Sequence, residues 1–443
     1  MTDCSIPGSG GGVVAAKCGT LTVAENRSAA GSRSIGLYVA ILPATSKASV
    51  QEPVFFIAGG PGGSTVEQWS QAASIFFGLN AHHDIVLVDQ RGTGQSHQLM
   101  ITPQNPGETP TEYAARALAA MDGDPRYYTT AVAMDDLDAV RQSLGYSKID
   151  LYGGSYGATA VQYYIRQHGD HVHAAVLDGG TLIDVPILEL IAANSQRALD
   201  DVFYRCLAEA ACAQAFPNVG TEFATVLDRL RRAPVATDVQ DAIGQPIDVT
   251  SDLFAGLIHQ LMVISDSASI PWLVHQAWSG NFAEVAGQVT RAFPRSSPTP
   301  VMSIEIMCVE AWARHDSNQV SALGQGSYYL SSQLSWAQSM EASCSYVPPG
   351  YVPANDAQPV QTSLPILLLN GTDDPQDPPA NVAMAREQMP NSLSVTPSGL
   401  GHTVGHIGCL PRLVARFFDT GKTDAAAAQA CLATMPPPSF RLS

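Results

Sequence analysis

The stretch Gly153-Gly154-Ser155-Tyr156-Gly157, of the form G-x-S-x-G, decides the fold of this chain. It follows an apolar run at 149–152 and precedes a helical stretch at 158–168. The bare pattern arises easily by chance, and a glycine-rich turn without chemistry is the alternative. The strand–turn–helix context favours a nucleophile, because such a turn lifts a serine hydroxyl off a sheet edge beside the free N–H groups of a helix N-terminus.

Other apolar runs extend this unit to a whole sheet. Six short runs are bounded by turn residues, at 54–57, 85–88, 149–152, 174–177, 365–369 and 393–396. Such runs are typical of strands buried on both faces of a parallel sheet. Helical stretches separate several of them; in 132–144, for example, Leu137, Val140 and Leu144 share one face. The alternation predicts an α/β fold, a mostly parallel sheet with helices on both faces.

The alternation stops near residue 183 and resumes near 360. Mostly helical stretches lie between, at 187–207, 221–232, 251–264 and 301–314. We therefore predict three parts: the N-terminal part of the core at 1–182, an inserted helical cap at 183–357 and the C-terminal part of the core at 358–443. Stretches rich in glycine, serine or proline, at 8–12, 296–300 and 348–359, are expected to be loops or boundaries.

A nucleophilic serine needs a histidine base, and the histidine needs an acid that fixes its tautomer. On this kind of sheet the chain order is serine, acid, histidine. The loop after 365–369 offers Asp373, Asp374 and Asp377, which compete for the role of the acid. His402 follows the last apolar run among small residues and is the expected base, with His406 as its rival. A surface or structural histidine is the alternative for either one.

The oxyanion of acyl transfer needs two N–H donors. The first is expected from the backbone of Tyr156, directly after the nucleophile. The second is expected from Gly60, in the loop Ala58-Gly59-Gly60-Pro61-Gly62-Gly63 that follows the run at 54–57. The alternatives are a plain glycine turn and a phosphate-binding loop, but the latter lacks its Gly-Lys-Ser/Thr ending.

Several stretches together resemble a known family. They are Gly59-Gly60-Pro61-Gly62, Asp89-Gln90-Arg91-Gly92-Thr93-Gly94-Gln95-Ser96, Leu151-Tyr152-Gly153-Gly154-Ser155-Tyr156-Gly157, the opening Cys18-Gly19-Thr20-Leu21-Thr22-Val23, and the path from Leu367-Leu368-Leu369-Asn370-Gly371 through Asp374-Pro375 to Gly401-His402, Cys409 and Cys431. The chain resembles α/β-hydrolases of the proline iminopeptidase and tripeptidyl aminopeptidase group. The likeness covers nearly the whole core and is weak in the cap, apart from Met307-Cys308-Val309-Glu310.

The resemblance implies an α/β-hydrolase fold with Ser155 as nucleophile, His402 as base and Asp374 as orienting acid. Two positions depart from the family pattern. Ala58 replaces a histidine before Gly-Gly-Pro-Gly, and Asp377 replaces a threonine in Asp-Pro-x-Thr-Pro, which puts an extra acid beside the triad. Asp89 and Arg91 are expected to be buried or paired, with structural roles.

The implied reaction is acyl transfer to Ser155 and then to water, which needs no cofactor and no metal. An aminopeptidase also needs a carboxylate for the free α-ammonium of a peptide; Glu310 and Glu305 are candidates, although they are five residues apart and do not quite share a helix face. A solvated helix face is the alternative for both. Three classes stay open: a prolyl- or tripeptidyl-type aminopeptidase, an esterase or amidase on small acyl substrates, and an inactive binding protein, which the intact triad disfavours.

Composition restricts the partners. The 443 residues are 45% hydrophobic and 14% charged, as in a folded protein, and the net charge is −17. An acidic chain disfavours nucleic acid and anionic membranes, so the expected partner is a peptide or small acyl substrate. No apolar run reaches membrane-spanning length.

Cysteine usage suggests the compartment. Eight cysteines allow 105 full pairings, the four nearest-neighbour pairs would each close a modest loop, and none has Cys-x-x-Cys spacing. We expect disulfides, with reduced buried thiols as the alternative; the family resemblance also implies them. The chain opens Met-Thr-Asp-Cys without a signal peptide, so we expect a mature secreted or envelope protein whose leader is absent, or else a cytosolic one. The cysteines are Cys4, Cys18, Cys206, Cys212, Cys308, Cys344, Cys409 and Cys431.

Overall fold

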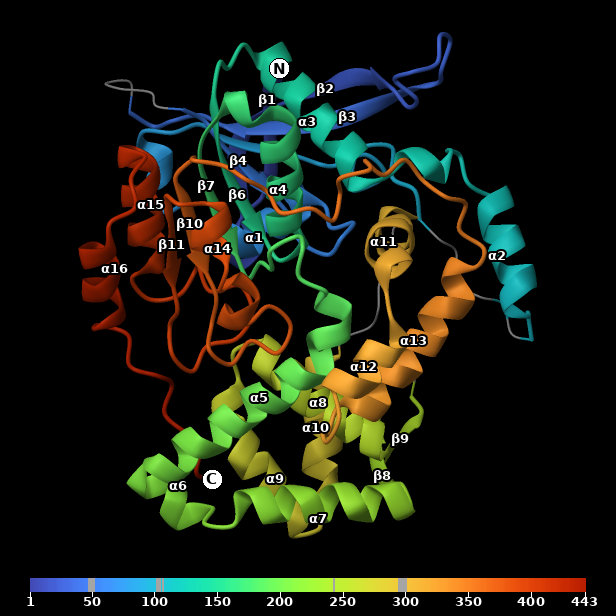
Figure 1. Ribbon diagram of the computed structural model, residues 1–443, viewed down its shortest axis with the longest axis vertical. Coiled ribbons are helices and arrows are strands. Elements are labelled where there is room, and N and C mark those ends of the chain that lie inside the picture. Colours follow the sequence, from blue (N-terminus) through green and yellow to red (C-terminus); the bar gives the residue numbers. More distant parts are fainter. Residues whose placement is uncertain (47–51, 101–104, 106, 242–243, 294–300) are drawn as a thin grey trace.

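The computed structural model describes residues 1–46, 52–100, 105, 107–241, 244–293 and 301–443. The loop expected at 296–300 lies outside these residues. A sheet with flanking helices forms one end of the molecule, and a helical body forms the other (Figure 1). The functional residues expected from the sequence come from both parts.

A nine-stranded sheet organises the core, in the order β1-β2-β3-β5-β4-β6-β7-β10-β11. From β5 to β11 all neighbours are parallel. Every one of the six predicted apolar runs is a strand, which confirms the parallel α/β sheet. These strands are β4 (Val54–Ile57), β5 (Ile85–Val88), β6 (Ile149–Gly154), β7 (Val172–Asp178), β10 (Ile366–Leu369) and β11 (Ser392–Val395).

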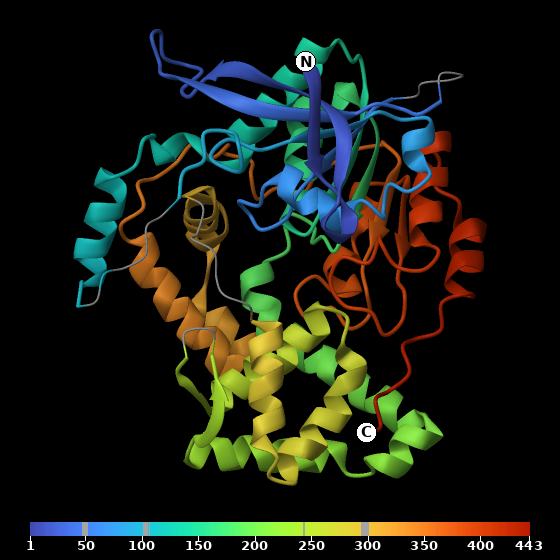
Figure 2. The same ribbon diagram turned by 180° about the vertical axis from the view of Figure 1, so that it is seen from behind.

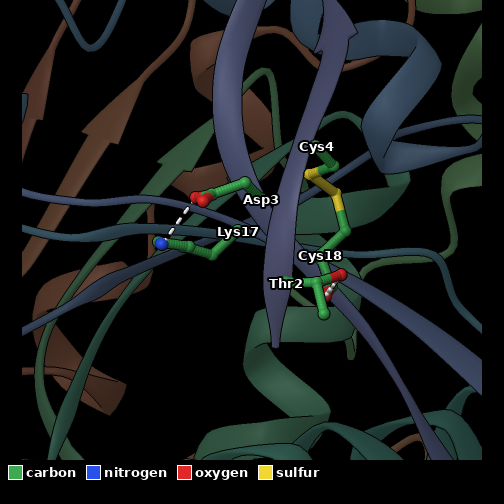
Figure 3. The surroundings of a disulfide bond; sticks show 5 residues. All are labelled: Thr2, Asp3, Cys4, Lys17 and Cys18. Carbon is green, nitrogen blue, oxygen red and sulfur yellow. Dashed lines mark hydrogen bonds and ion pairs between the residues drawn. A yellow bond between two sulfur atoms is a disulfide. The ribbon is translucent and has the colours of Figure 1, made fainter.

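Three antiparallel strands at one edge were not predicted: β1 (Thr2–Pro7), β2 (Val13–Ala24) and β3 (Ser34–Leu42). The glycine-rich stretch at 8–12 joins β1 to β2 and contains a short 3-10 turn, Ser9–Gly11. The disulfide Cys4–Cys18 links the two strands, and Lys17 Nζ lies 2.5 Å from Asp3 Oδ1 next to it (Figure 3).

Helices cover both faces of the sheet. Adjacent residues of β6 show the two layers: Leu151 belongs to a buried cluster with Val161, whereas Tyr152 belongs to another cluster with Trp69 and Phe417. The core helices are α1 (Thr65–Ala72), α2 (Pro110–Ala119), α3 (Thr130–Leu144), α4 (Tyr156–His168), α14 (Ala385–Gln388), α15 (Leu410–Thr420) and α16 (Ala425–Leu432), with 3-10 turns at Leu79–Ala81, Pro125–Tyr127, Gly169–His171 and Pro379–Val382.

The residues between β7 and β10, here called the insertion, form the helical body with its own buried cluster. Its helical character matches the prediction, but the antiparallel hairpin of β8 (Val235–Gln240) and β9 (Pro246–Val249) was not expected. We retain 183 and 357 as proposed limits of the cap. The helices are α5 (Ile187–Ala208), α6 (Ala210–Ala215), α7 (Val219–Arg232), α8 (Ser251–Val263), α9 (Ile270–Trp278), α10 (Phe282–Ala292), α11 (Val301–Ile306), α12 (Ser317–Leu323) and α13 (Leu330–Cys344), with 3-10 turns at Ser267–Ser269 and Trp312–Arg314 and a π-helical turn at Met307–Ala311.

The C-terminal residues connect the two parts. After α16 the chain leaves the core and runs to the insertion, where it ends beside α9 (Figure 2). Phe440 is buried in the cluster of the insertion, and the Arg441 N–H donates to the Ala268 carbonyl at 3.1 Å. The Arg441 guanidinium lies 3.2 Å from the centre of the Trp272 ring. The tail therefore fastens the insertion to the core.

All eight cysteines are paired, each with its nearest neighbour in the sequence: Cys4–Cys18, Cys206–Cys212, Cys308–Cys344 and Cys409–Cys431. Four disulfides are consistent with an extracellular protein. Within the described part of the chain, no helix is both long enough and apolar enough to cross a bilayer.

Candidate active site

Ser155 stands between the end of β6 and the start of α4, as the strand–turn–helix pattern predicts. Its backbone has φ 55° and ψ −126°, a conformation that non-glycine residues rarely adopt. The neighbouring strand holds it, because the Ser155 N–H donates to the Asp178 carbonyl at 2.8 Å. A Cβ at Gly157 would collide with the Ile57 carbonyl, so glycine is required for this close helix–strand approach.

His402 lies on the loop after β11, beside the same sheet edge. Its Nδ1 is 2.8 Å from Asp374 Oδ2. Gly179 directly follows Asp178, whose carbonyl accepts the Ser155 N–H. A Cβ added at Gly179 would lie 3.0 Å from His402 Nδ1. The Nε2 atom is buried and has no hydrogen-bond partner among the described residues, which leaves it free to accept a proton.

The three competing aspartates have different partners. Asp374 is bound to His402, and its Oδ1 accepts the Gln376 N–H at 2.8 Å. Asp373 pairs instead with Arg205 and accepts a hydrogen bond from Ser267 Oγ. Asp377 lies 3.6 Å from His402 Nδ1 and accepts from Thr181 Oγ1 at 2.5 Å. The geometry favours Asp374 as the orienting acid, and the rival base His406 is exposed.

The charges of this cluster shift its titration. Burial opposes ionisation of Asp374, but the charge and hydrogen bond of His402 hold the pKa of this carboxyl below its usual range. Burial also opposes charge on the imidazole, yet Asp374, and with it Asp377 and Asp178, raises the pKa of His402 to about 9. Burial and the Asp374 charge raise the pKa of Asp377, against the effect of His402.

Asp374, Asp377 and His402 bring carboxylate and imidazole atoms within 4.8 Å of one another, a grouping that metal sites also show. The 2.8 Å separation between His402 Nδ1 and Asp374 Oδ2 is a hydrogen-bond distance, with a proton between the two atoms. We therefore interpret these three residues as a proton-transfer cluster.

Asp178, at the end of β7, holds the histidine loop and was not anticipated from the sequence. Its carboxylate accepts the N–H groups of Val404 at 2.7 Å and Gly405 at 3.0 Å, and the Tyr152 hydroxyl at 2.5 Å. The side chain is fully buried, and burial raises its pKa. The only sequence signal was an acid directly after an apolar run. Asp178 thus fixes the backbone that follows His402.

The insertion holds the acid and base loops from the other side. Arg197 of α5 donates to the carbonyl oxygens of Thr372 and Asp374, each at 3.1 Å. From α8, the Val263 carbonyl accepts the His402 N–H at 2.9 Å. The site is therefore built jointly by the core and the insertion.

The expected oxyanion donors, Gly60 and Tyr156, line the same cavity as Ser155. The loop that carries Gly60 lies directly against the nucleophile, since a Cβ at Gly59 would be 2.9 Å from Ser155 Cβ. This approach suits backbone N–H groups that face a carbonyl bound at Ser155.

Asp89 and Arg91 are buried and paired beneath this loop, as expected. Asp89 accepts from the Ser64 hydroxyl at 2.8 Å and from the Val66 N–H at 3.1 Å, at the start of α1. Arg91 forms two hydrogen bonds with Asp136, at 2.7 and 2.8 Å. Both residues have a structural role beneath the site, and neither lines the cavity.

A cavity of about 400 Å³, lined by Ser155, Gly60 and Tyr156, lies between the core and the insertion. Much of its wall is apolar, with Leu182, Ile183, Val185, Leu188, Ile191 and Ile306. The ionisable side chains in the wall are those of Glu310, Arg314, Asp377 and His259, together with tyrosines. A cavity of this size suits a short peptide segment or a small acyl group.

Glu310, in the π-helical turn, is one of two carboxylates in the wall of this cavity; the other is Asp377, beside His402. Glu310 accepts the Thr130 N–H at 2.6 Å and the Thr130 hydroxyl at 2.7 Å. The hydroxyl in turn lies 2.8 Å from the Tyr156 hydroxyl. Burial raises the pKa of Glu310 to about 7, although the Thr130 bonds oppose the shift. Its orientation is therefore fixed relative to the residue after the nucleophile.

Glu305 does not line the cavity. Its side chain is almost fully buried, and neither oxygen has a hydrogen-bond partner within the described part of the chain. Burial, followed by the Glu310 and Asp124 charges, raises the pKa of Glu305 to about 8. Both glutamates are buried, so the alternative interpretation, that they lie on a solvated helix face, is wrong for both.

The fold and this site agree with a match to a family model. The model, described as alpha/beta hydrolase fold, matches residues 52–406. The chain belongs to this family, as the sequence motifs imply.

Parts of the chain are similar to particular proteins of known name. A proline iminopeptidase of Neisseria gonorrhoeae is 31% identical over 127 residues, 29% of this chain and 32% of that protein. One of Arabidopsis thaliana is 26% identical over 186 residues, 42% of this chain and 37% of that protein. The chain thus matches about a third of the length of these relatives. A solved proline iminopeptidase of Mycobacterium smegmatis has a TM-score of 0.39 and 12% identity, over 91% of this chain and 98% of that one.

Proposed function

We propose that this protein is a serine hydrolase that cleaves peptide bonds near a free N-terminus. Ser155 is the nucleophile, His402 the base and Asp374 the orienting acid. The observation that carries the proposal is that a buried carboxylate, Glu310, faces the same cavity as Ser155. A nucleophile and a fixed negative charge in one pocket suit a substrate with an ammonium group near its scissile bond.

The hydrogen bond between His402 and Asp374, together with the position of Ser155 at the strand–helix turn, supports an acyl-enzyme mechanism. His402 Nε2 takes the Ser155 proton while Oγ attacks the substrate carbonyl, and the N–H groups of Tyr156 and Gly60 hold the oxyanion. The C–N bond breaks as His402 returns the proton to the leaving amine, and water then releases the acyl group by the same steps. Loss of one oxyanion donor typically costs about 3 kcal/mol in the barrier. The mechanism needs no cofactor.

Glu310 is the proposed partner of the substrate ammonium. Its hydrogen bonds to Thr130 fix both oxygens, so a bound ammonium meets a preorganised charge. An ammonium also favours ionisation of a carboxyl whose pKa burial has raised to about 7. The relatives named proline iminopeptidase support this substrate class. Glu305 does not line the cavity, so we propose no direct contact between its carboxyl group and the substrate ammonium.

An esterase or amidase of small acyl substrates is the second candidate. The apolar wall of the cavity favours it, because an acyl chain could fill that space without any ammonium. The four disulfides support a secreted or cell-envelope location for either activity.

The test compares three chromogenic substrates: a peptide p-nitroanilide with a free N-terminus, its N-acetylated form with the same leaving group, and a short-chain p-nitrophenyl ester. We expect cleavage of the free anilide well above the acetylated one. Cleavage of the ester alone would contradict the aminopeptidase proposal and support the esterase. Ser155→Ala, with an unchanged melting temperature, should abolish all turnover; retained activity would contradict the nucleophile assignment.

A further inference from the structure

A second histidine, His259 of α8, faces the cavity that contains Ser155. It is 7% exposed, and its ring stacks on Tyr329 with centroids 4.4 Å apart and planes 10° apart. Neither the triad nor the ammonium site uses it. The stacking fixes the plane of the ring, so its nitrogen atoms point in defined directions.

The hydrogen bonds of Ser195 favour one tautomer of His259. Ser195 Oγ donates its only hydrogen to the Ile191 carbonyl at 2.7 Å. The same oxygen is 2.9 Å from His259 Nδ1, and while it donates to the carbonyl it accepts at Nδ1, which favours the tautomer with the proton on Nδ1. Burial lowers the pKa of His259 to about 4, which keeps the ring neutral near pH 7. Its Nε2 therefore presents a lone pair, with no partner among the described residues.

The position of His259 relates it to the proton-transfer step. Val263, one helical turn further along α8, accepts the His402 N–H at 2.9 Å. Burial is the main cause of the lowered pKa of His259; the charge of His402 adds to the shift and that of Asp374 opposes it. In acyl transfer to serine the base hands its proton to the leaving group. We therefore expect the leaving group of a bound substrate to lie near His259, which lines the same cavity as Ser155.

We propose that His259 Nε2 accepts a hydrogen bond from the N–H of the scissile amide and so makes the site selective for amides over esters. This inference rests on the proposed peptidase function. A scissile amide that enters the cavity loses water from its N–H and needs an acceptor there, whereas an ester has no such hydrogen. His259 forms and breaks no covalent bond; it is a specificity-determining residue.

The experiment uses a peptide p-nitroanilide and the p-nitrophenyl ester of the same acyl group. His259→Phe keeps a ring to stack on Tyr329 and removes the acceptor. We expect kcat/KM for the anilide to fall about tenfold, as for one lost hydrogen bond, and the ester to lose less than about threefold. His259→Gln, whose amide oxygen can replace Nε2, should recover part of the anilide rate.

Ser195→Ala is the second variant, because it removes the group that favours the tautomer with the proton on Nδ1 but leaves the imidazole in place. It should reduce the anilide rate selectively and by less than His259→Phe. Equal losses on the two substrates in both variants would overturn the inference and show a packing role. Wild-type protein that cleaves the ester and leaves the anilide intact would instead refute the peptidase function itself, and this inference with it.

Discussion

The Oδ2 atom of Asp377 lies 3.6 Å from Nδ1 of His402. The expected base is therefore flanked by a second carboxylate besides the one that orients it. This residue is also one of the two departures from the family pattern. Because negative groups favour the charged imidazole, they hold the pKa of His402 above its ordinary value, at about 9.

Asp377→Asn should therefore move the acid limb of the pH profile. Turnover requires neutral His402, so kcat/KM rises as pH passes upward through its pKa. Removal of the Asp377 charge lowers that pKa and shifts the limb to lower pH, by about one unit. The measurement is kcat/KM against pH. Asp373→Asn is the matched control, because Asp373 pairs with Arg205 and should leave the limb in place. A shift to higher pH in Asp377→Asn would contradict the expectation.

Glu310→Gln tests the ammonium site. It keeps the size of the side chain but removes the charge, so kcat/KM for a free peptide anilide should fall about tenfold to a hundredfold. The acetylated anilide and the ester should change little. Glu305→Gln makes the same chemical change in the same segment, outside the cavity, and should not alter the preference for a free N-terminus. Equal losses on free and blocked substrates would remove Glu310 from substrate recognition.

The disulfide Cys308–Cys344 should stabilise the fold more than Cys206–Cys212. Their sequence separations are 36 and 6 residues, and a longer closed loop restricts the unfolded chain more. Replacing each pair by alanine should cost about 4 and about 2 kcal/mol of unfolding free energy, respectively. Urea denaturation of the two double variants measures both values. The reverse order would show that native packing, and not chain entropy, dominates.

The C-terminal tail should contribute to stability through Phe440. Its ring is buried in the cluster of the insertion, so Phe440→Ala should cost about 3 kcal/mol. Leu442 is two residues further on and 43% exposed, so Leu442→Ala should cost less than about 0.5 kcal/mol. Thermal or urea unfolding of both variants provides the comparison. A stable Phe440→Ala protein would mean that the tail only rests on the insertion.

The parallel part of the sheet was predictable because its strands are buried on both faces. Runs such as Val54–Ile57 then contain no polar residue at all. The strand β3 contains an apolar run at 37–42 that could have marked it. The edge strand β1 was missed because it is mostly exposed. In Thr2–Pro7 only one residue is buried, so the sequence is mostly polar and no continuous apolar run marks the strand.

Within the site, the strand–turn–helix geometry at Ser155 was predictable because it is local and requires small residues at fixed spacing. Spacing alone could not choose among Asp373, Asp374 and Asp377, since all three follow the same strand; only the family resemblance pointed to Asp374. Asp178 and His259 were missed because their roles depend on Val404, Gly405 and Ser195, which are remote in the chain. No local pattern encodes such contacts.

The hydrogen bond from His402 to the Val263 carbonyl has a consequence for how this molecule could change over evolutionary time. Helix α8, which contributes His259 to the cavity wall, also binds the backbone of His402, the proposed base. Exchange of the whole of α8 between relatives therefore preserves the position of His402 only where the new helix supplies a carbonyl at the same point. Point substitutions on the cavity side of α8 alter the pocket and leave that hydrogen bond intact, so they are the easier route to a new specificity.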